Sequence, residues 1–249
     1  MNIEKFQDVQ KIKLRISPFL PNMFVYVYIV DELLIDTGPR QRKARLSEII
    51  HTNNIEKVAI THEHNDHCGM AKWISKNFSI PIYVNKEKIK KIPFSCMQYP
   101  EKIELKNHTL VPVYTPGHTR GHTCLYEPDK GWLFSGDLYV TPHPKVSLWS
   151  ESLSKYIDSL KTVLTLDFDT LFCAHQGVVL NGRKKLEEKL EYLTMIQAEA
   201  VELYNRGYSP RMIAKKLFPK KAKLERISFG AFSSLHLVRQ LIRAHKKQA

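Results

Sequence analysis

Four side chains of the type that binds metal ions lie within six positions, in the segment T-H-E-H-N-D-H-C-G at 61–69. Three are histidines and one is an aspartate: His62, His64, Asp66 and His67. Imidazole is the commonest neutral metal ligand in proteins, and a carboxylate adds charge to such a site. An apolar run precedes the segment and a predicted helix follows from Met70. We expect a strand that ends in a metal-binding loop; the simpler alternative is a solvated turn on which histidines cluster by chance.

The spacing of these histidines differs from that of a metal site built on a single helix. A zincin helix carries its two histidines at positions i and i+4, on one face, with a glutamate as the base. Here the later histidines stand at i+2 and i+5 from His62, so no single helical face gathers all three. A looped backbone can instead divide them between two adjacent ions.

Three later segments also end an apolar run in a residue of this type. Residues 115–123 carry His118 and His122, residues 132–139 carry Asp137, and residues 170–177 carry His175. A glycine near each of these residues lets the backbone turn after the predicted strand. Four such strand ends in one chain predict a single site at one end of a sheet.

This ordered set resembles the metallo-β-lactamase superfamily of hydrolases, over about residues 20–180. The resemblance implies seven ligands, three for each of two ions and one that bridges both: His62, His64 and His118 for the first, Asp66, His67 and His175 for the second, and Asp137 between them. It also implies that Asp36, in L-L-I-D-T-G, orients the metal-binding loop, and that His122 lies beside the ligands without binding metal.

Metal-binding histidines need an acceptor for their second ring N–H. Asp36, Thr61 and Thr119 are the best placed by sequence to supply one, although ordinary turn chemistry explains the two threonines equally well.

Two divalent ions about 3.5–4 Å apart lower the pKa of a shared water from about 15.7 toward neutrality and so supply a hydroxide bridging the two metal ions. Asp66 is expected to hold this hydroxide and to pass a proton to the leaving group. Tyr139 either donates a hydrogen bond to an oxyanion or packs in the core. A histidine-rich site with two carboxylates suits Zn2+, while Mn2+ and Fe2+ also fit.

The apolar patterning predicts an α/β fold with two blocks of strands and helices between them. Strands are expected at 23–30, 33–36, 57–61, 80–84, 109–115, 123–127, 131–135 and 170–174, and helices at 41–50, 69–77 and 153–166. This order fits the four-layer αβ/βα sandwich of the resembled family. We assign residues 1–182 to a catalytic domain of this type.

Residues 183–249 are expected to form a basic C-terminal helical appendage. A long helix to about Arg206, a short helix from Ser209–Pro210 to Leu217 and a final amphipathic helix are predicted, with a break at 220–226. The appendage has 16 lysines and arginines against 6 acidic residues, so it carries most of the net charge of +13. The charge indicates a nucleic-acid or anionic-substrate surface, or a solvated helix surface, which we favour.

The remaining features predict a cytoplasmic location. No apolar run approaches the roughly 20 residues of a transmembrane helix, and the N-terminus has no apolar signal core. The four cysteines, Cys68, Cys96, Cys124 and Cys173, form no C-x-x-C pair, as expected in a reducing compartment. Cys68 is either a metal ligand or a small buried residue beneath the site.

We expect a hydrolase of a small-molecule ester, thioester or lactone. The segment Q-G-V-V-L-N-G after His175 differs from the His-Glu-Tyr-Thr sequence of glutathione-thioester hydrolases, which argues against glutathione recognition. The alternatives are a phosphodiesterase or endoribonuclease that uses the basic tail to bind nucleic acid, and a mononuclear iron enzyme similar to sulfur dioxygenases.

Overall fold

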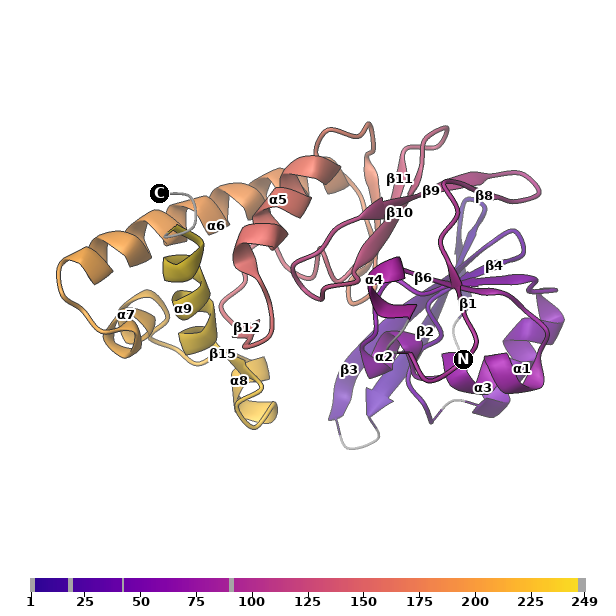
Figure 1. Ribbon diagram of the computed structural model, residues 1–249, viewed down its shortest axis with the longest axis horizontal. Helices are drawn as coiled ribbons and strands as arrows, with labels where there is room; N and C mark the ends of the chain where they lie inside the picture. The colour runs from indigo at the N-terminus through magenta and orange to yellow at the C-terminus, as the bar shows by residue number, and fades with distance from the viewer. Residues whose placement is uncertain (1–2, 18–19, 42, 90–91, 246–249) are drawn as a thin grey trace. The chain divides into compact units, whose positions relative to one another are not determined.

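The computed structural model describes residues 3–17, 20–41, 43–89 and 92–245, which form two compact units (Figure 1). Unit 1 contains Met1–Tyr114, Arg120–Val140 and Asp167–Gly182. Unit 2 contains Thr115–Thr119, Thr141–Leu166 and Arg183–Ala249. The division between a catalytic domain at 1–182 and an appendage at 183–249 stays a prediction.

The first sheet of unit 1 has seven strands, hydrogen-bonded in the order of the sequence. They are β1 (Ile3–Phe6), β2 (Val9–Ser17), β3 (Leu20–Val30), β4 (Leu33–Ile35), β5 (Lys57–Ala59), β6 (Ile82–Val84) and β7 (Met97–Gln98). The first four strands form antiparallel hairpins, whereas β4 to β7 run parallel to one another. Parallel neighbours need a crossover connection, and helices supply it between β4, β5 and β6.

Helices α1 (Lys43–Thr52) and α3 (Ala71–Asn77) cover one face of this sheet (Figure 1). Leu46, Ile49 and Ile50 of α1 follow each other at helical spacing, so one side of the helix is apolar. Together with Ile74 of α3 they pack against the apolar face of β2 to β6 and are almost fully buried. Two shorter helices, α2 (Asn65–Cys68) and α4 (Lys86–Ile89), also belong to unit 1.

The second sheet of unit 1 has six strands in the order β14-β13-β11-β10-β9-β8. They are β8 (Ile103–Glu104), β9 (Thr109–Tyr114), β10 (Thr123–Glu127), β11 (Trp132–Gly136), β13 (Thr170–Cys173) and β14 (Gly177–Val179). Only β11 and β13 are parallel among these described strands, and the other neighbours are antiparallel.

Aromatic side chains fill the core between the two sheets. Phe134 and Phe172 stack at 4.6 Å, and Tyr28 of the first sheet meets both rings edge-on at 5.6 and 5.4 Å. The buried Tyr28 hydroxyl donates a hydrogen bond of 2.6 Å to the carbonyl oxygen of Cys173. This bond ties the first sheet to β13, the strand that leads to one of the candidate metal ligands.

Unit 2 is built mainly of helices. They are α5 (Leu153–Val163), α6 (Gly182–Asn205), α7 (Pro210–Leu217), α8 (Lys223–Ile227) and α9 (Ser234–His245). Helix α9 packs against α5 and α7. Strand β12 (Ser147–Leu148) pairs with β15 (Phe232–Ser233), and Gln240 donates a hydrogen bond to the carbonyl oxygen of Leu148 at 2.6 Å. Residues 147–148 are therefore held to the C-terminal helices.

The strands and helices expected between residues 23 and 217 are observed, with ends shifted by a few residues. Ser209 caps α7 as expected, since its hydroxyl accepts a hydrogen bond from the backbone N–H of Met212. The structure differs from the expectation at both ends of the chain. Strands β1 and β2 were not predicted, although the alternation of apolar and basic residues in β2 is itself typical of a half-buried strand. The break expected at 220–226 contains the short helix α8. Among the described residues, no helix has the length and apolar character to cross a membrane.

The aromatic core yields a stability prediction. We expect Phe172→Ala to lower the free energy of unfolding by about 3–5 kcal/mol, because the ring is buried and leaves a cavity between the sheets. Phe229→Ala is the control, since this side chain is fully exposed, and its change is expected to stay within about 0.5 kcal/mol. Urea unfolding followed by circular dichroism measures both, and equal effects of the two substitutions would contradict the packing described here.

Candidate metal centre

Several of the residues predicted to bind metal or to orient the ligands follow the carboxyl ends of strands in unit 1. Asp36 comes directly after β4, and residues 61–62 follow the neighbouring parallel strand β5. Asp137 comes directly after β11, and His175 follows β13, which is parallel to β11. Parallel neighbours end at the same edge, so two pairs of strands bring these side chains to one end of the sandwich.

The histidine-rich segment contains one turn of helix, where the sequence predicted a loop. In α2 the backbone N–H groups of His67 and Cys68 both donate to the carbonyl oxygen of His64, at 3.0 and 2.9 Å. Four residues are too few for apolar periodicity to reveal a helix. The turn separates His62 and His64, which precede it, from Asp66 and His67, which lie within it.

Asp36 holds this segment through a buried carboxylate. One oxygen accepts a hydrogen bond from the backbone N–H of Thr61 at 2.8 Å. The other accepts from the Thr61 hydroxyl at 2.8 Å and from Nδ1 of His67 at 2.7 Å. Asp36 has a φ of 61°, an uncommon conformation for a residue other than glycine and typical of functional sites.

Thr61 passes the same constraint on to His62. Its hydroxyl proton goes to Asp36, so its oxygen can accept the Nδ1–H of His62 at 3.1 Å. Asp36 and Thr61 therefore occupy the orienting positions that the sequence indicated. The sequence reasoning missed Thr37, whose backbone N–H and hydroxyl both donate to the carbonyl oxygen of His67, at 2.7 and 2.9 Å. The D-T-G segment carried that signal, but only its aspartate was considered.

The two carboxylate oxygens of Asp137 face two different sets of histidines. Oδ2 lies 3.8 Å from Nε2 of His62. Oδ1 lies 3.3 Å from Nε2 of His67 and 3.2 Å from Nε2 of His175. One buried carboxylate thus stands between the two sets of histidines.

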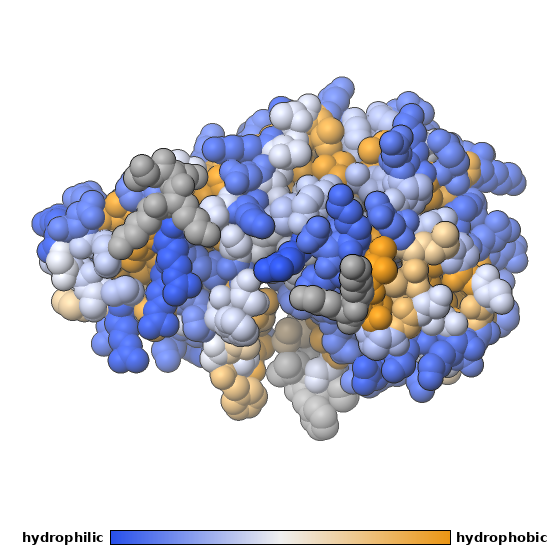
Figure 2. Space-filling view, in the orientation of Figure 1, coloured by the Kyte–Doolittle hydropathy of each residue, from blue (hydrophilic) through white to orange (hydrophobic). Residues whose placement is uncertain are grey.

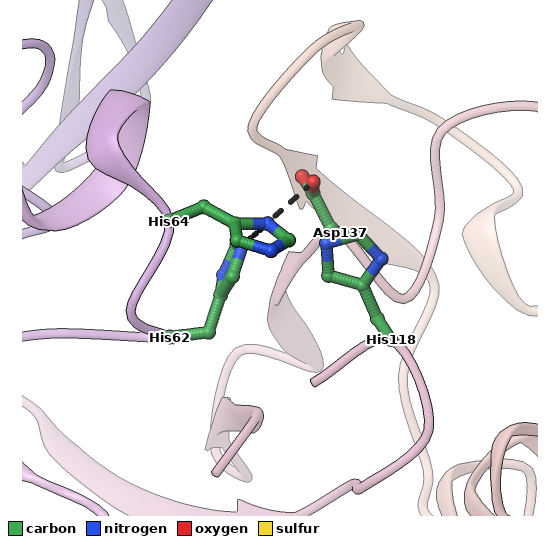
Figure 3. Close-up of side chains that lie close together, drawn as sticks. All are labelled: His62, His64, His118 and Asp137. Carbon is green, nitrogen blue, oxygen red and sulfur yellow. Dashed lines mark hydrogen bonds and ion pairs between the residues drawn. The ribbon is translucent and has the colours of Figure 1, made fainter. Parts of the chain in front are cut away.

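The first group contains His62, His64 and Asp137 of unit 1, whose ligand atoms lie within 4.8 Å of one another (Figure 3). Nε2 of His62 and Nδ1 of His64 are 3.0 Å apart, two ring nitrogens that converge from neighbouring positions of one loop. His118 belongs to the segment Thr115–Thr119 of unit 2. There its Nδ1 donates to the carboxylate of Glu151 at 2.7 Å. Glu151 was also missed, because it lies 33 residues away with no motif around it.

The second group contains Asp66, His67 and His175, again with ligand atoms within 4.8 Å of one another. Nδ1 of His175 donates to the carbonyl oxygen of Phe24 at 2.9 Å, which leaves Nε2 to face Asp137. A carboxylate oxygen of Asp66 lies 3.7 Å from the same Nε2. These contacts set the orientation of the His175 ring through the backbone of β3.

The tautomers of these histidines suit a metal ion. His62, His67, His118 and His175 each have Nδ1 against an oxygen acceptor of the protein, so Nε2 is the nitrogen with a lone pair. Nε2 of His67 is buried and makes no hydrogen bond to any described residue. A buried ring nitrogen without a hydrogen bond, facing two carboxylates, is a donor that fits a divalent cation.

The carboxylates also control the protonation of these rings when no metal is bound. Burial lowers the pKa of His67, but the negative charges of Asp137 and Asp36 outweigh burial and hold the pKa well above its usual value. Burial likewise lowers the pKa of His175, and the charge of Asp137 raises it further than burial lowers it. The site therefore attracts positive charge.

His122 supports the end of β11. Its Nε2 accepts a hydrogen bond of 3.1 Å from the backbone N–H of Asp137. This bond fixes the backbone from which the Asp137 carboxylate extends. Gly136, with a φ of +47°, makes this approach possible, because a Cβ there would lie 2.8 Å from Nε2 of His122 and 3.0 Å from Cβ of Thr61. The resemblance implied such a supporting position for His122.

Three further residues that the sequence singled out are largely buried. Tyr139 is 4% exposed, and its backbone oxygen accepts from the thiol of Cys173 at 2.6 Å. Thr119 is buried in unit 2, in a turn where its carbonyl oxygen accepts the Gly117 N–H at 3.1 Å. Cys68 donates to the carbonyl oxygen of Glu63, and burial raises the pKa of its thiol to about 11. A thiol that is protonated at neutral pH supports the packing alternative for Cys68.

Comparison with known proteins identifies the family. The model of the metallo-beta-lactamase superfamily matches residues 20–95 and 97–175. The chain belongs to this superfamily, which confirms the resemblance noted in the sequence.

Two curated proteins share about a third of their aligned residues with this chain but differ in how much of their length it covers. A probable metallo-hydrolase, YybB of Bacillus subtilis, is 30% identical over 170 residues, covering 59% of this chain and 76% of the relative. The lactamase-like protein nscB of Arthroderma benhamiae is 30% identical over 152 residues, covering 59% of this chain but 33% of the relative. The chain thus spans about three quarters of one and a third of the other.

Solved structures confirm the fold. A metallo-beta-lactamase family protein from Thermus thermophilus superimposes with a TM-score of 0.72 at 18% identity, over 98% of this chain and 94% of that one. A beta-lactamase domain protein from Burkholderia ambifaria gives a TM-score of 0.74 at 16% identity, over 97% and 88%. The expected sandwich of two sheets and helices is therefore correct.

The network around Asp36 predicts the effect of a neutral replacement. Asp36→Asn keeps the size of the side chain but replaces an acceptor with an N–H donor near His67. We expect the affinity for Zn2+ to fall about 10- to 100-fold, as when a residue that orients a metal ligand is lost. Equilibrium dialysis against zinc buffers measures this, with Asp129→Asn, an exposed aspartate in a turn, as the control. Unchanged zinc affinity would show that Asp36 does not orient the ligands.

Proposed function

We propose that this chain is a metal-dependent hydrolase with a centre for two divalent ions. The single observation that carries the proposal is the carboxylate of Asp137, whose Oδ2 faces His62 while Oδ1 faces His67 and His175. A carboxylate between two sets of imidazoles is an arrangement that suits two neighbouring cations. Membership of the metallo-beta-lactamase superfamily supports the same conclusion.

In this proposal each of the two groups of side chains described above binds one ion. His62, His64 and His118 hold the first ion, Asp66, His67 and His175 hold the second, and Asp137 contributes an oxygen to each. We propose Zn2+ for both positions, because imidazole nitrogens dominate the donor set. When bound, two such ions lower the pKa of a shared water, so that a hydroxide nucleophile is available at neutral pH, and polarise the bond to be cleaved.

The residues of the chain then position the reacting groups. The Asp66 carboxylate remains about a quarter exposed while the histidine beside it is buried, so it is the carboxylate of the second group that a substrate can reach. We assign it the role of holding the attacking water and passing a proton to the leaving group. Asp36, Thr61 and His122 orient the ligands, and Thr119 is assigned the same role from unit 2. Tyr139 is proposed as a hydrogen-bond donor to the developing oxyanion.

The proposed substrate is a small ester, thioester or lactone, which this chemistry cleaves by attack on a carbonyl carbon. The similarity to a probable metallo-hydrolase supports a hydrolytic reaction. Cytoplasmic location stays a prediction from the cysteines and the N-terminal sequence.

Loss of single ligands tests the proposal. We expect Asp137→Ala and His118→Ala each to lower turnover by more than about 100-fold, a larger effect than the loss of a residue that only orients a ligand. The measurement is a screen of zinc- and manganese-loaded protein on thioesters, lactones, bis(p-nitrophenyl) phosphate and short RNAs. Circular dichroism checks that each variant is folded, and Asp129→Ala is the control.

Metal analysis adds an independent measurement, and two zinc ions per chain are the expected result. Full turnover in either ligand variant, or a single iron per chain with oxygen consumption, contradicts the two-metal hydrolase.

A phosphodiesterase acting on nucleic acid is the second candidate, because exposed cations cluster in unit 2. Helix α7 and the segment after it carry seven exposed basic residues and one acidic residue between positions 207 and 231: Arg211, Lys215, Lys216, Lys220, Lys221, Lys223 and Arg226, against Glu225. Hydrophilic side chains also predominate over the end of unit 2 that carries α7 in Figure 2.

Salt dependence separates this candidate from the first. A surface that binds phosphates releases counterions, so RNA cleavage is expected to fall steeply, by at least about tenfold, between 0.05 and 0.2 M salt. Hydrolysis of a neutral lactone is expected to change little over the same range. RNA cleavage that is insensitive to salt would exclude the basic surface from substrate binding.

A further inference from the structure

Strand β2 presents three basic side chains on the same face of the first sheet. Lys11, Lys13 and Arg15 alternate with Ile12 and Leu14, which are buried under the helices on the opposite face. The basic residues therefore point to the side of the sheet that, farther along the strands, packs against the second sheet.

Two aromatic residues of β3 share this face. Lys13 is paired in register with Tyr26, and Arg15 with Phe24. The ammonium group of Lys13 lies 4.2 Å from the centre of the Phe24 ring and 5.8 Å from that of Tyr26. A cation over an aromatic face at these distances is attracted by the ring, so the two rings hold the Lys13 side chain in place.

Lys11 and Lys13 differ in whether a carboxylate pairs with their ammonium group. The ammonium group of Lys11 forms an ion pair of 2.8 Å with Glu4. No carboxylate of a described residue lies within ion-pair distance of Lys13, although the charge of Glu4 acts on it from farther away, and the Lys13 side chain is exposed. A positioned but unpaired cation is available for a negatively charged ligand.

The same part of β3 carries the backbone contacts of a candidate metal ligand. Its residue Phe24 accepts the Nδ1–H of His175 at 2.9 Å, and the N–H of Tyr26 donates to the carbonyl oxygen of Ala174 at 2.7 Å. The ring of Tyr26 also lies over Gly177, where a Cβ would be 3.6 Å from Cζ. The face with Lys13 therefore borders the turn that carries His175, inside unit 1.

We propose that Lys13, held against Phe24 and Tyr26, binds an anionic oxygen group, carboxylate or phosphate, of a substrate whose reacting bond lies at the metal centre. The inference rests on the proposed function and adds the substrate class to it: small molecules with a negative charge separated from the bond to be cleaved. The ammonium group supplies the charge, and the aromatic rings favour positions of the side chain close to β3, whose backbone binds His175.

Direct binding tests the inference without catalysis. Benzoate, phenylphosphonate and neutral benzamide are titrated into the zinc-loaded protein by NMR, and into the variants Lys13→Met and Lys13→Arg. We expect Lys13→Met to raise the Kd of benzoate, phenylphosphonate or both about fivefold, as for a solvent-accessible ion pair, and Lys13→Arg to keep it. The Kd of benzamide stays unchanged. Lys72→Met, on the exposed side of α3, is the matched control.

Catalysis supplies a second measurement with a matched pair of substrates. The kcat/KM for 4-acetoxybenzoate relative to methyl 4-acetoxybenzoate is expected to fall about fivefold in Lys13→Met and to stay constant in Lys72→Met. An unchanged Kd of both anions in Lys13→Met overturns the inference, whatever the activity. Absence of hydrolysis of any ester by the wild-type protein instead counts against the proposed function, and the binding titrations then still decide the role of Lys13.

Discussion

A buried carboxylate has to be matched by donors, and the Asp36 carboxylate is the point from which the arrangement of the site follows. Its hydrogen bonds come from three donors, the backbone N–H and hydroxyl of Thr61 and the ring of His67. Removing these groups from water without such bonds would cost several kcal/mol, so the loop after β5 has little freedom to adopt another conformation. Because β4 and β5 are parallel neighbours, the carboxylate and its donors meet without a long connection. The left-handed backbone of Asp36 is compatible with that meeting and is stabilised by it.

The second carboxylate, Asp137, depends on this order. The rings of His62 and His67 can face Asp137 with Nε2 only because Thr61 and Asp36 engage their Nδ1 atoms. The backbone of Phe24 does the same for His175. Four acceptors from different segments thus select one tautomer at four histidines, counting Glu151 beside His118. Fixing the tautomer and the ring orientation in advance prepares these histidines to bind a cation.

The candidate ligands can be picked out of the sequence because they stand at the ends of apolar strands, in segments where several residues of one chemical type are close together. The residues that orient the ligands were harder to identify. Asp36 and Thr61 adjoin recognisable segments, whereas Glu151 and the carbonyl oxygen of Phe24 are ordinary groups whose importance comes from tertiary contacts 33 and 151 residues away in sequence. The short helix α2 escaped prediction for a different reason, since one turn has no apolar periodicity and depends on the carbonyl of His64 and the contacts of Thr37.

Strand β2 shows what a strand pattern leaves undetermined. A half-buried strand alternates apolar residues with polar ones, and β2 follows that pattern. The face with the basic residues packs between the two sheets at Val9, whereas Lys13 on the same face lies against Phe24 and Tyr26. Solvation and these aromatic faces stabilise the charge of Lys13, while Lys11 pairs with Glu4. A strand that retains a positioned charge without an ion pair, next to a ring that the same sheet orients, is better explained by recognition of a ligand than by stability.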